Sequence, residues 1–119
     1  MGILEEQKKA DVMAISLDGM FRLPIRGKIT FLGRNAECGD YMRDKNYVAV
    51  RHAAVTIEDG KVYVEDLRPC NGTYINGVRM KPGTRECVSP SDVVGLGSND
   101  VTQTGVAFLK FVIEGLDYE

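Results

Sequence analysis

One arginine of the sequence stands where it could bind an anion. Arg34 follows Gly33 directly after an apolar run, and the glycine permits an unusual backbone conformation next to the cation. A guanidinium group presents a planar fork of N–H donors that matches the oxygens of a phosphate group. The alternative is an ordinary surface arginine that pairs with Glu37 or Asp40, and Arg34 by itself does not decide between the two.

Candidate residues for catalysis or metal binding are few. His52 is the only histidine, and no other His or Cys motif accompanies it as a metal site would require. No Ser or Cys stands in a recognisable nucleophile motif, and the sequence has no glycine-rich loop of the NTPase type. We therefore expect a chain that is not an enzyme and that uses no metal and no cofactor.

The cysteines indicate a reducing compartment. Cys38, Cys70 and Cys87 are an odd number and lack Cys-x-x-Cys spacing, which argues against a disulfide framework and against structural zinc. Charged residues interrupt the start of the chain before the apolar core of a signal peptide could form. We therefore expect reduced thiols in a cytoplasmic protein.

Length and charge limit the class of protein further. A chain of 119 residues is long enough for one domain with its own hydrophobic core. A net charge of −2 and the lack of a long apolar run make nucleic acid and membranes poor candidates as partners. We expect the domain to span residues 11–114, with residues 1–10 as a flexible lead-in and residues 115–119 as a tail.

Short runs of alternating apolar residues predict an all-β fold. The runs lie at residues 12–17, 21–25, 28–32, 53–57, 61–65, 74–75, 78–79, 93–97 and 106–113. Asp59-Gly60 and Asn76-Gly77 are typical of two-residue hairpin turns, and Pro24 is typical of an edge strand. Many short strands at near-regular spacing indicate a two-sheet antiparallel β-sandwich of about 10–11 strands.

Two polar segments interrupt this pattern of strands. Residues 35–47 are too polar for a core strand and too long for a hairpin turn, so we expect a surface loop. Residues 66–70 form a second loop between runs. Loops at one end of a sandwich can bind a ligand together, and here those loops would be 33–52 and 66–77.

Three short motifs, in their order and spacing, resemble the signature of the forkhead-associated (FHA) domain family. Gly33-Arg34 ends one strand, Val50-Arg51-His52 follows the polar loop, and residues 71–77 read Asn-Gly-Thr-Tyr-Ile-Asn-Gly. The resemblance covers residues 11–114 and implies a β-sandwich that recognises phosphothreonine in a protein partner. The implied role is a non-catalytic one in Ser/Thr kinase signalling, and such domains commonly occur within larger proteins or complexes.

The resemblance also implies roles for single residues. Arg34 would bind the phosphate group, and the amide of Asn71 would pair with the backbone of an extended peptide. His52 would hold the phosphate-binding loops together by hydrogen bonds, and Gly33 would support the same frame. The remaining structural positions of the site would be Gly72, Thr73, Asn76 and Gly77.

Two hydroxyl groups of the family pattern are missing here. Ala49 stands where the family has a Ser that binds a phosphate oxygen, and Pro69-Cys70 stand where it often has Ser-Thr. Losing one hydrogen bond to a charged group costs roughly 1.5–3 kcal/mol, or about ten- to a hundredfold in affinity. A degenerate domain that binds its protein partner without phosphate therefore remains an alternative.

Neighbouring groups could compensate for these losses. The backbone N–H groups of Val50 and Cys70 can donate whatever side chains stand there. Side chains close to the site in sequence are those of Lys45, Tyr47 and Arg51. In the family, residues of these loops also select the third peptide residue after the phosphothreonine, and by position these would be Tyr47, Arg68 and Pro69.

Overall fold

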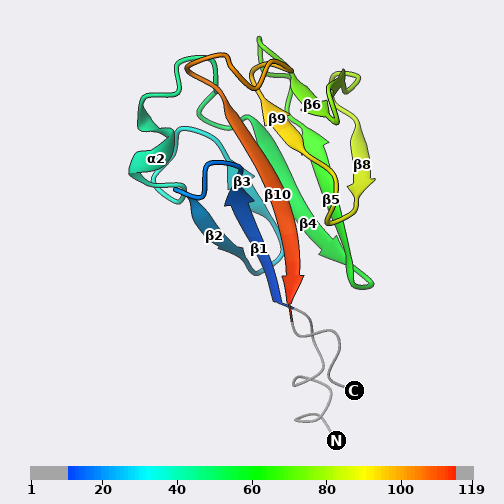
Figure 1. Cartoon of the computed structure of the whole chain (residues 1–119). Helices are drawn as coiled ribbons and strands as arrows, with labels where there is room; N and C mark the ends of the chain where they lie inside the picture. The colour runs from blue at the N-terminus through cyan, green and yellow to red at the C-terminus, as the bar shows by residue number, and fades with distance from the viewer. Residues whose placement is uncertain (1–10, 115–119) are drawn as a thin grey trace, which may run out of the picture.

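The computed structural model describes residues 11–114, which fold into two antiparallel β-sheets packed face to face (Figure 1). The strands are β1 (Asp11–Ser16), β2 (Arg22–Ile25), β3 (Thr30–Leu32), β4 (Ala53–Glu58), β5 (Lys61–Asp66), β6 (Thr73–Ile75), β7 (Val78–Arg79), β8 (Arg85–Val88), β9 (Val94–Leu96) and β10 (Ala107–Glu114). One sheet has the order β2-β1-β10-β9-β6-β7, and the other has the order β3-β4-β5-β8. The predicted sandwich and its strand number are confirmed.

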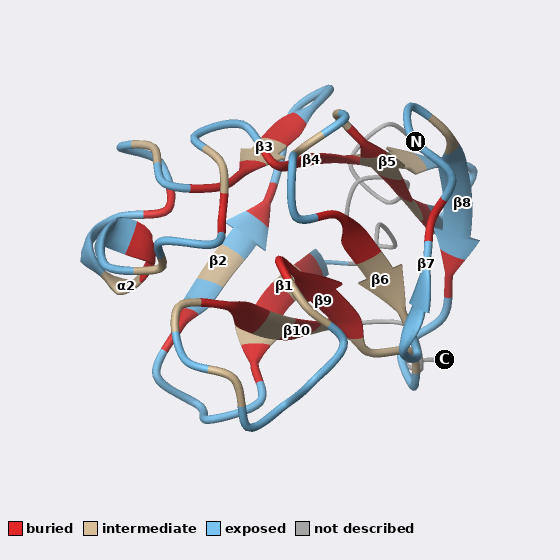
Figure 2. Cartoon of the chain, turned by 90° about the horizontal axis from the view of Figure 1, so that it is seen from above, coloured by how far each residue is buried: buried red, intermediate tan, exposed pale blue. Residues whose placement is uncertain are grey.

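Alternating side chains fill the space between the sheets. In β1, Val12 and Ala14 are buried while Met13 and Ile15 are only half-buried, as expected for a strand with one face on the core. The buried segments meet in the middle of the molecule (Figure 2). Burial of one large apolar side chain contributes about 1.5–3 kcal/mol, and the largest fully buried ones are Phe111, Leu32, Met42, Leu96 and Leu109.

The predicted turns are confirmed by their backbone angles. Asp59 and Gly60 have φ values of 54° and 76°, and Asn76 and Gly77 have φ values of 52° and 85°. A type I′ turn needs positive φ at both central residues, which explains these residue pairs. Pro24 lies in β2 at the edge of the six-stranded sheet, where its missing N–H donor costs no ladder hydrogen bond.

Two elements differ from the prediction. The segment 35–47 is not wholly a surface loop, because it contains the helical turn α2 (Asp40–Arg43) and places Cys38 and Met42 in the core. A helix of four residues is too short to give a periodic signal in the sequence. Strand β8 was not predicted, since three of its four residues are exposed and the sequence shows no alternation there.

The two ends of the sandwich carry different parts of the chain. Asp11 and Glu114 are cross-strand partners, and both described ends leave the sandwich at its lower end in Figure 1. The loops 33–52, 67–72 and 97–106 lie at the opposite end. Residues 1–10 and 115–119, predicted as lead-in and tail, lie outside the described residues. Between residues 11 and 114, no helix has the length and hydropathy needed to cross a membrane.

Candidate functional site

Gly33 lets two loop segments come into direct contact at the upper end of the sandwich. A Cβ atom on Gly33 would lie 2.2 Å from the carbonyl oxygen of Val50 and 2.4 Å from that of Ala49. The backbone N–H of Arg34 donates to Ala49 O at 3.0 Å, and the side-chain amide of Asn35 donates to Val50 O at 3.0 Å. Only glycine fits here, and the contact places Arg34 beside residues 49–50.

His52 joins the two predicted ligand loops. Its imidazole is completely buried; Nδ1 accepts the backbone N–H of Ala49 at 3.0 Å, and Nε2 lies 2.7 Å from the carbonyl oxygen of Gly72. Because Nδ1 accepts, the proton of the neutral ring is on Nε2, which donates to Gly72. Burial lowers the pKa of His52, so the ring is neutral when it makes these two bonds.

Arg34 and Asn71 are held by two consecutive carbonyl groups. Arg34 Nε donates to Val48 O at 2.5 Å, and Asn71 Nδ2 donates to Tyr47 O at 3.1 Å. Within residues 11–114, the two terminal nitrogens of Arg34 have no hydrogen-bond partner. The side-chain oxygen of Asn71 has none either within this range. The two side chains are therefore oriented by the same short segment, and both keep free hydrogen-bonding groups.

The two altered positions retain backbone donors. Ala49 is half-buried and Cys70 is exposed, and neither side chain supplies the hydroxyl group of the family pattern. Across the part of the chain that the structure describes, the backbone N–H groups of Val50 and Cys70 have no acceptor. An anion beside Arg34 could thus still find N–H donors at both positions.

The side chains of Lys45, Tyr47 and Arg51, which could compensate for the missing hydroxyl groups, differ in their contacts. Tyr47 is 44% exposed, but residues 45–51 form turns, so Tyr47 and Ala49 do not share the face of an extended strand. The guanidinium of Arg51 lies 4.4 Å from the centre of the Phe31 ring, and Lys45 Nζ lies 4.4 Å from that of Tyr41. Both cations therefore have aromatic partners in this structure.

The Asn-Gly-Thr segment and its hairpin brace the site from below. Gly72 has a positive φ of 84° at the turn, and the buried Thr73 begins β6. Asn76 donates to the Asp92 carboxylate at 2.9 Å and accepts the N–H of Val93 at 2.9 Å. These bonds fix the hairpin, which fits the structural role predicted for Asn76 and Gly77.

Arg79 is a residue of this region that the sequence analysis missed. Its Nη2 donates to the carbonyl oxygen of Cys70 at 3.3 Å, and its guanidinium packs against Gly72. The Asn76-Gly77 turn returns the chain so that Arg79 pairs with Tyr74 across the hairpin. That register follows from the two-residue turn and could have placed Arg79 opposite Tyr74, close to the segment 70–72 that it contacts.

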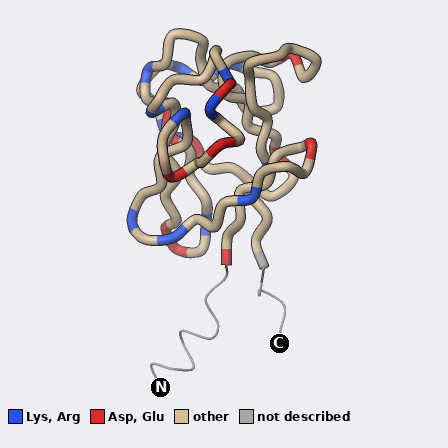
Figure 3. The backbone as a smooth tube through the Cα atoms, turned by 90° about the vertical axis from the view of Figure 1, so that its left-hand side faces the viewer, with Lys and Arg blue, Asp and Glu red and all other residues tan. Residues whose placement is uncertain are grey.

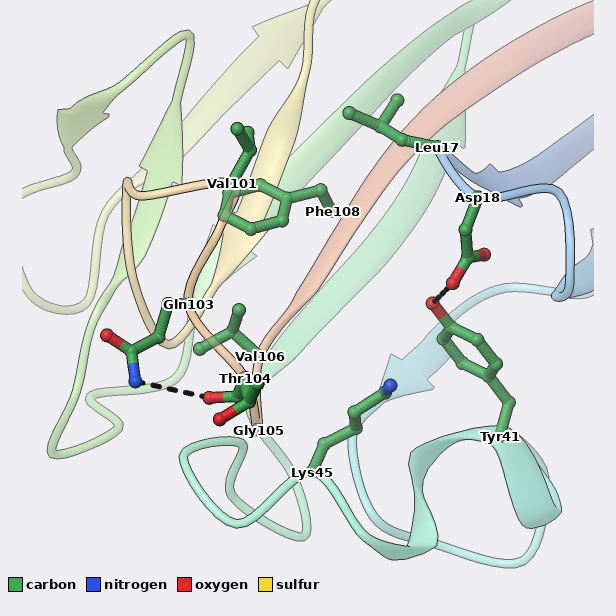
Figure 4. A pocket seen from close by; sticks show the side chains of 10 residues that line it. All are labelled: Leu17, Asp18, Tyr41, Lys45, Val101, Gln103, Thr104, Gly105, Val106 and Phe108. Carbon is green, nitrogen blue, oxygen red and sulfur yellow. Dashed lines mark hydrogen bonds between the residues drawn. The ribbon is translucent and has the colours of Figure 1, made fainter.

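A separate hollow of about 330 Å³ lies between the segment 41–45 and residues 101–108 (Figure 4). Leu17, Val101 and Phe108 form its apolar part, and Tyr41 donates to the Asp18 carboxylate at 2.9 Å beside Lys45. Burial raises the pKa of Tyr41, while a hydrogen bond from Ser16 lowers the pKa of Asp18. Of the residues considered for the ligand site in the sequence analysis, only Lys45 lines this hollow.

The charges on this part of the molecule are mixed. On the side that carries α2, Lys and Arg are interspersed with Asp and Glu (Figure 3), so there is no extended field of one sign. Among residues 11–114, no group of three or more His, Cys, Asp or Glu could hold a metal ion.

Comparison with known sequences gives partial matches. Protein FraH of Nostoc sp. (strain PCC 7120 / SAG 25.82 / UTEX 2576) is 40% identical over 50 residues, which cover 42% of this chain and 17% of FraH. Vacuolar protein sorting-associated protein 64 of Saccharomyces cerevisiae is 33% identical over 58 residues, which cover 47% of this chain and 9% of that protein. The chain thus matches less than a fifth of the length of either relative.

Comparison with solved structures confirms the fold. The N-terminal FHA domain of S. cerevisiae Rad53p, solved in complex with a phosphothreonine peptide, superposes with a TM-score of 0.72. The alignment covers 87% of this chain and 94% of that domain at 18% sequence identity. The sequence pattern of the FHA domain matches residues 30–97, more than half of the chain. The chain belongs to the FHA domain family.

Proposed function

We propose that this chain is a non-catalytic module that recognises phosphothreonine in a protein partner and thereby couples a Ser/Thr kinase to its targets. The observation that supports this most strongly is the common anchoring of Arg34 and Asn71 on the carbonyl groups of Val48 and Tyr47. Among the described residues, it leaves the terminal nitrogens of Arg34 and the amide oxygen of Asn71 without a partner, at the end of the sandwich where the loops meet.

The chemistry of the ligand matches these groups. Phosphothreonine carries almost two negative charges and three acceptor oxygens at neutral pH. The terminal nitrogens of Arg34 would bind two of the oxygens, and the N–H groups of Val50 and Cys70 would supply further donors. The side-chain oxygen of Asn71 would accept an N–H from the peptide backbone.

His52 would act without touching the ligand. The neutral imidazole ties Ala49 to Gly72 and so keeps the phosphate-binding loops at a fixed separation. Because these loops are already ordered before the ligand binds, less conformational entropy is lost on binding, which favours affinity.

The missing hydroxyl groups at Ala49 and Cys70 support one second candidate function. Without them, the domain could bind a folded protein partner in a manner that does not depend on phosphate. In that case Arg34 would contribute no more than an ordinary surface cation, since an exposed ion pair is worth about 0–1 kcal/mol.

A binding experiment distinguishes the two functions. A degenerate phosphothreonine peptide library and the matching unphosphorylated library are titrated against the wild type, Arg34→Ala and Arg26→Ala. Arg26 is an exposed arginine in the segment between β2 and β3, and this segment lies at the opposite end of the sandwich (Figure 1). We expect binding to require the phosphate and to weaken about a hundredfold in Arg34→Ala but not in Arg26→Ala. Equal binding of both libraries, or full binding by Arg34→Ala, would refute the proposal.

A further inference from the structure

The carbonyl group of Cys70 is bound by a side chain of the neighbouring hairpin. Arg79 lies in β7, which pairs with β6 directly after the segment 70–72 (Figure 2). Its Nη2 donates to Cys70 O at 3.3 Å. A Cβ atom on Gly72 would lie 2.5 Å from Arg79 Nε and 2.8 Å from its Cζ, so the guanidinium rests directly on the backbone of this segment.

The contacts of Arg79 are unlike those of a second arginine beside a tyrosine. Arg85 on β8 stacks on Tyr63, with 4.0 Å between the guanidinium carbon and the ring centre, and pairs with Glu58 at 2.7 Å. The guanidinium carbon of Arg79 lies 6.0 Å from the centre of the Tyr74 ring, which is the limit of a cation–π contact. Among residues 11–114 it has no carboxylate partner. A backbone carbonyl group is therefore its main polar partner.

The bond to Cys70 O also fixes the direction of the next N–H group. The peptide bonds between residues 11 and 114 are trans, and in a planar trans peptide the C=O and the following N–H point in opposite directions. Since Cys70 O points toward Arg79, the backbone N–H of Asn71 points away from Arg79. Asn71 is exposed, and its N–H has no acceptor among the described residues. The segment thus holds an unpaired donor in a fixed direction.

Other bonds hold the two sides of this peptide group. Gly72 O accepts a hydrogen bond from His52 Nε2 at 2.7 Å, and the side chain of Asn71 donates to Tyr47 O at 3.1 Å. Neither bond involves the C=O or the N–H of the peptide group between residues 70 and 71. In the part of the chain that is described, only the guanidinium of Arg79 binds this group. Without that bond, the peptide plane could rotate and the N–H would lose its direction.

We propose that the backbone N–H of Asn71 binds a phosphate oxygen of the phosphothreonine, and that Arg79 is the residue that positions this donor. The inference rests on the function proposed above. Consecutive backbone nitrogens lie close together, so an oxygen that the N–H of Cys70 reaches is near that of Asn71 as well. A cation that donates to the C=O of a peptide group polarises the group, which makes its N–H a stronger donor. Arg79 acts through Asn71 and does not touch the ligand.

This donor would offset part of what the altered positions lack. Ala49 and Cys70 have no hydroxyl group, whereas a backbone N–H is present whatever the side chain is. The phosphate would then be bound by Arg34 and by the N–H groups of residues 50, 70 and 71. Affinity would depend on the orientation of the segment 70–72, and hence on Arg79.

Nuclear magnetic resonance tests the donor directly. The probe is the phosphothreonine peptide that the wild type selects from the library described above, and its unphosphorylated form is the control. We expect the backbone amide proton of Asn71 to move downfield with the phosphopeptide, as a proton does when it forms a hydrogen bond to an anion. The control peptide should leave it in place.

Three variants test the positioning role. Arg79→Met keeps the apolar stem but removes the donor, so phosphopeptide affinity should fall about five- to tenfold with little change in the urea midpoint. Arg79→Lys keeps a cation that can donate to Cys70 O and should retain most of the affinity. Arg85→Met removes the same charge from the other sheet and should leave the affinity within about twofold.

A spectroscopic signature separates positioning from a general loss of charge. In the free protein, Arg79→Met should shift the ¹³C resonance of the Cys70 carbonyl group, and Arg79→Lys should shift it less. In the complex with Arg79→Met, the downfield movement of the Asn71 amide should be smaller than in the wild type. Arg85→Met should change neither signal.

The outcomes separate this inference from the proposed function. If the phosphopeptide binds through Arg34 but the Asn71 amide does not move, or if Arg79→Met binds as tightly as the wild type, the inference is refuted and the proposed function stands. Equal losses in Arg79→Met and Arg85→Met would also refute it, since only charge would then matter. If no phosphopeptide binds at all, both the proposed function and the role of Arg79 are wrong.

Discussion

The segment that connects β3 to β4 has an inner part around Gly33 and His52 and an outer part around α2, and the two are held by different interactions. The inner part is fixed by backbone contacts, by the buried imidazole of His52 and by the side-chain amide of Asn35. The outer part is fixed in the core by Met42, while its charged side chains remain exposed. The inner part therefore fixes the backbone of the candidate site, whereas packing does not hold the charged side chains of the outer part.

A similar contrast exists within the inner part itself. The positions that hold the frame match the FHA family pattern, whereas Ala49 and Cys70, which would contact the ligand, do not. The frame depends on a glycine, on a neutral histidine and on main-chain atoms, none of which needs the hydroxyl groups. Such a site can change its ligand contacts without losing its shape.

Gly33→Ala should disrupt the contact between Gly33 and residues 49–50, and this is the largest of the expected effects. The new Cβ would meet two backbone carbonyl oxygens that cannot move independently, so we expect the free energy of unfolding to fall by about 2–4 kcal/mol and phosphopeptide binding to be lost. Urea denaturation measures the first effect. Gly27→Ala is the control, because Gly27 also has positive φ but has no atom within 4 Å of the added Cβ. Equal losses in both variants would mean that only backbone strain, and not the contact with residues 49–50, matters at Gly33.

Ala49→Ser and Cys70→Thr should change the affinity for the ligand without changing the stability of the loops that form the site. Each variant restores one hydroxyl group near the proposed phosphate position, so we expect phosphopeptide affinity to rise about tenfold or more per substitution. The free energy of unfolding should change by no more than about 0.5 kcal/mol. Cys87→Thr is the matched control, since Cys87 is an exposed cysteine on β8. If both variants fold normally and neither gains affinity, the phosphate does not lie next to positions 49 and 70.

Lowering the pH should reduce the free energy of unfolding through protonation of His52, and this is the smallest of the expected effects. Burial lowers the pKa of the folded imidazole below its ordinary value of 6.5, although the hydrogen bond to Gly72 and the nearby Asp66 carboxylate act in the opposite direction. The unfolded chain therefore takes up the proton first, so stability is complete above pH 6.5 and falls as the pH drops through that value. The urea midpoint should be lower at pH 5.5 than at pH 7.5.

His52→Gln is the control for this pH dependence. This variant should be less stable than the wild type at both pH values, and its urea midpoint should no longer depend on pH between them. The carboxyl groups of Asp18 and Asp92, whose pKa values are lowered from 3.8, titrate below this range and should not contribute. A pH dependence that persists in His52→Gln would show that another group is responsible.

The sequence predicts the features that depend on local pattern. Two-residue turns such as Asn76-Gly77 need positive φ, and strands with one buried face alternate visibly, so both were identified correctly. The anchoring of α2 by Met42 was missed, because a single apolar residue in a polar segment does not reveal where it packs. The partners of Arg43 and Arg79 also depend on tertiary contacts, since a long side chain can reach several neighbours.

The pairing of Asp11 with Glu114 determines how the domain responds to force. Because these two residues lie side by side at the end opposite the ligand loops, pulling them apart would separate β1 from β10 one hydrogen bond at a time. A pull between a partner bound at the loop end and either Asp11 or Glu114 would instead load the strands along their length, so that many hydrogen bonds share the tension. The same module would therefore yield easily in the first direction and resist strongly in the second.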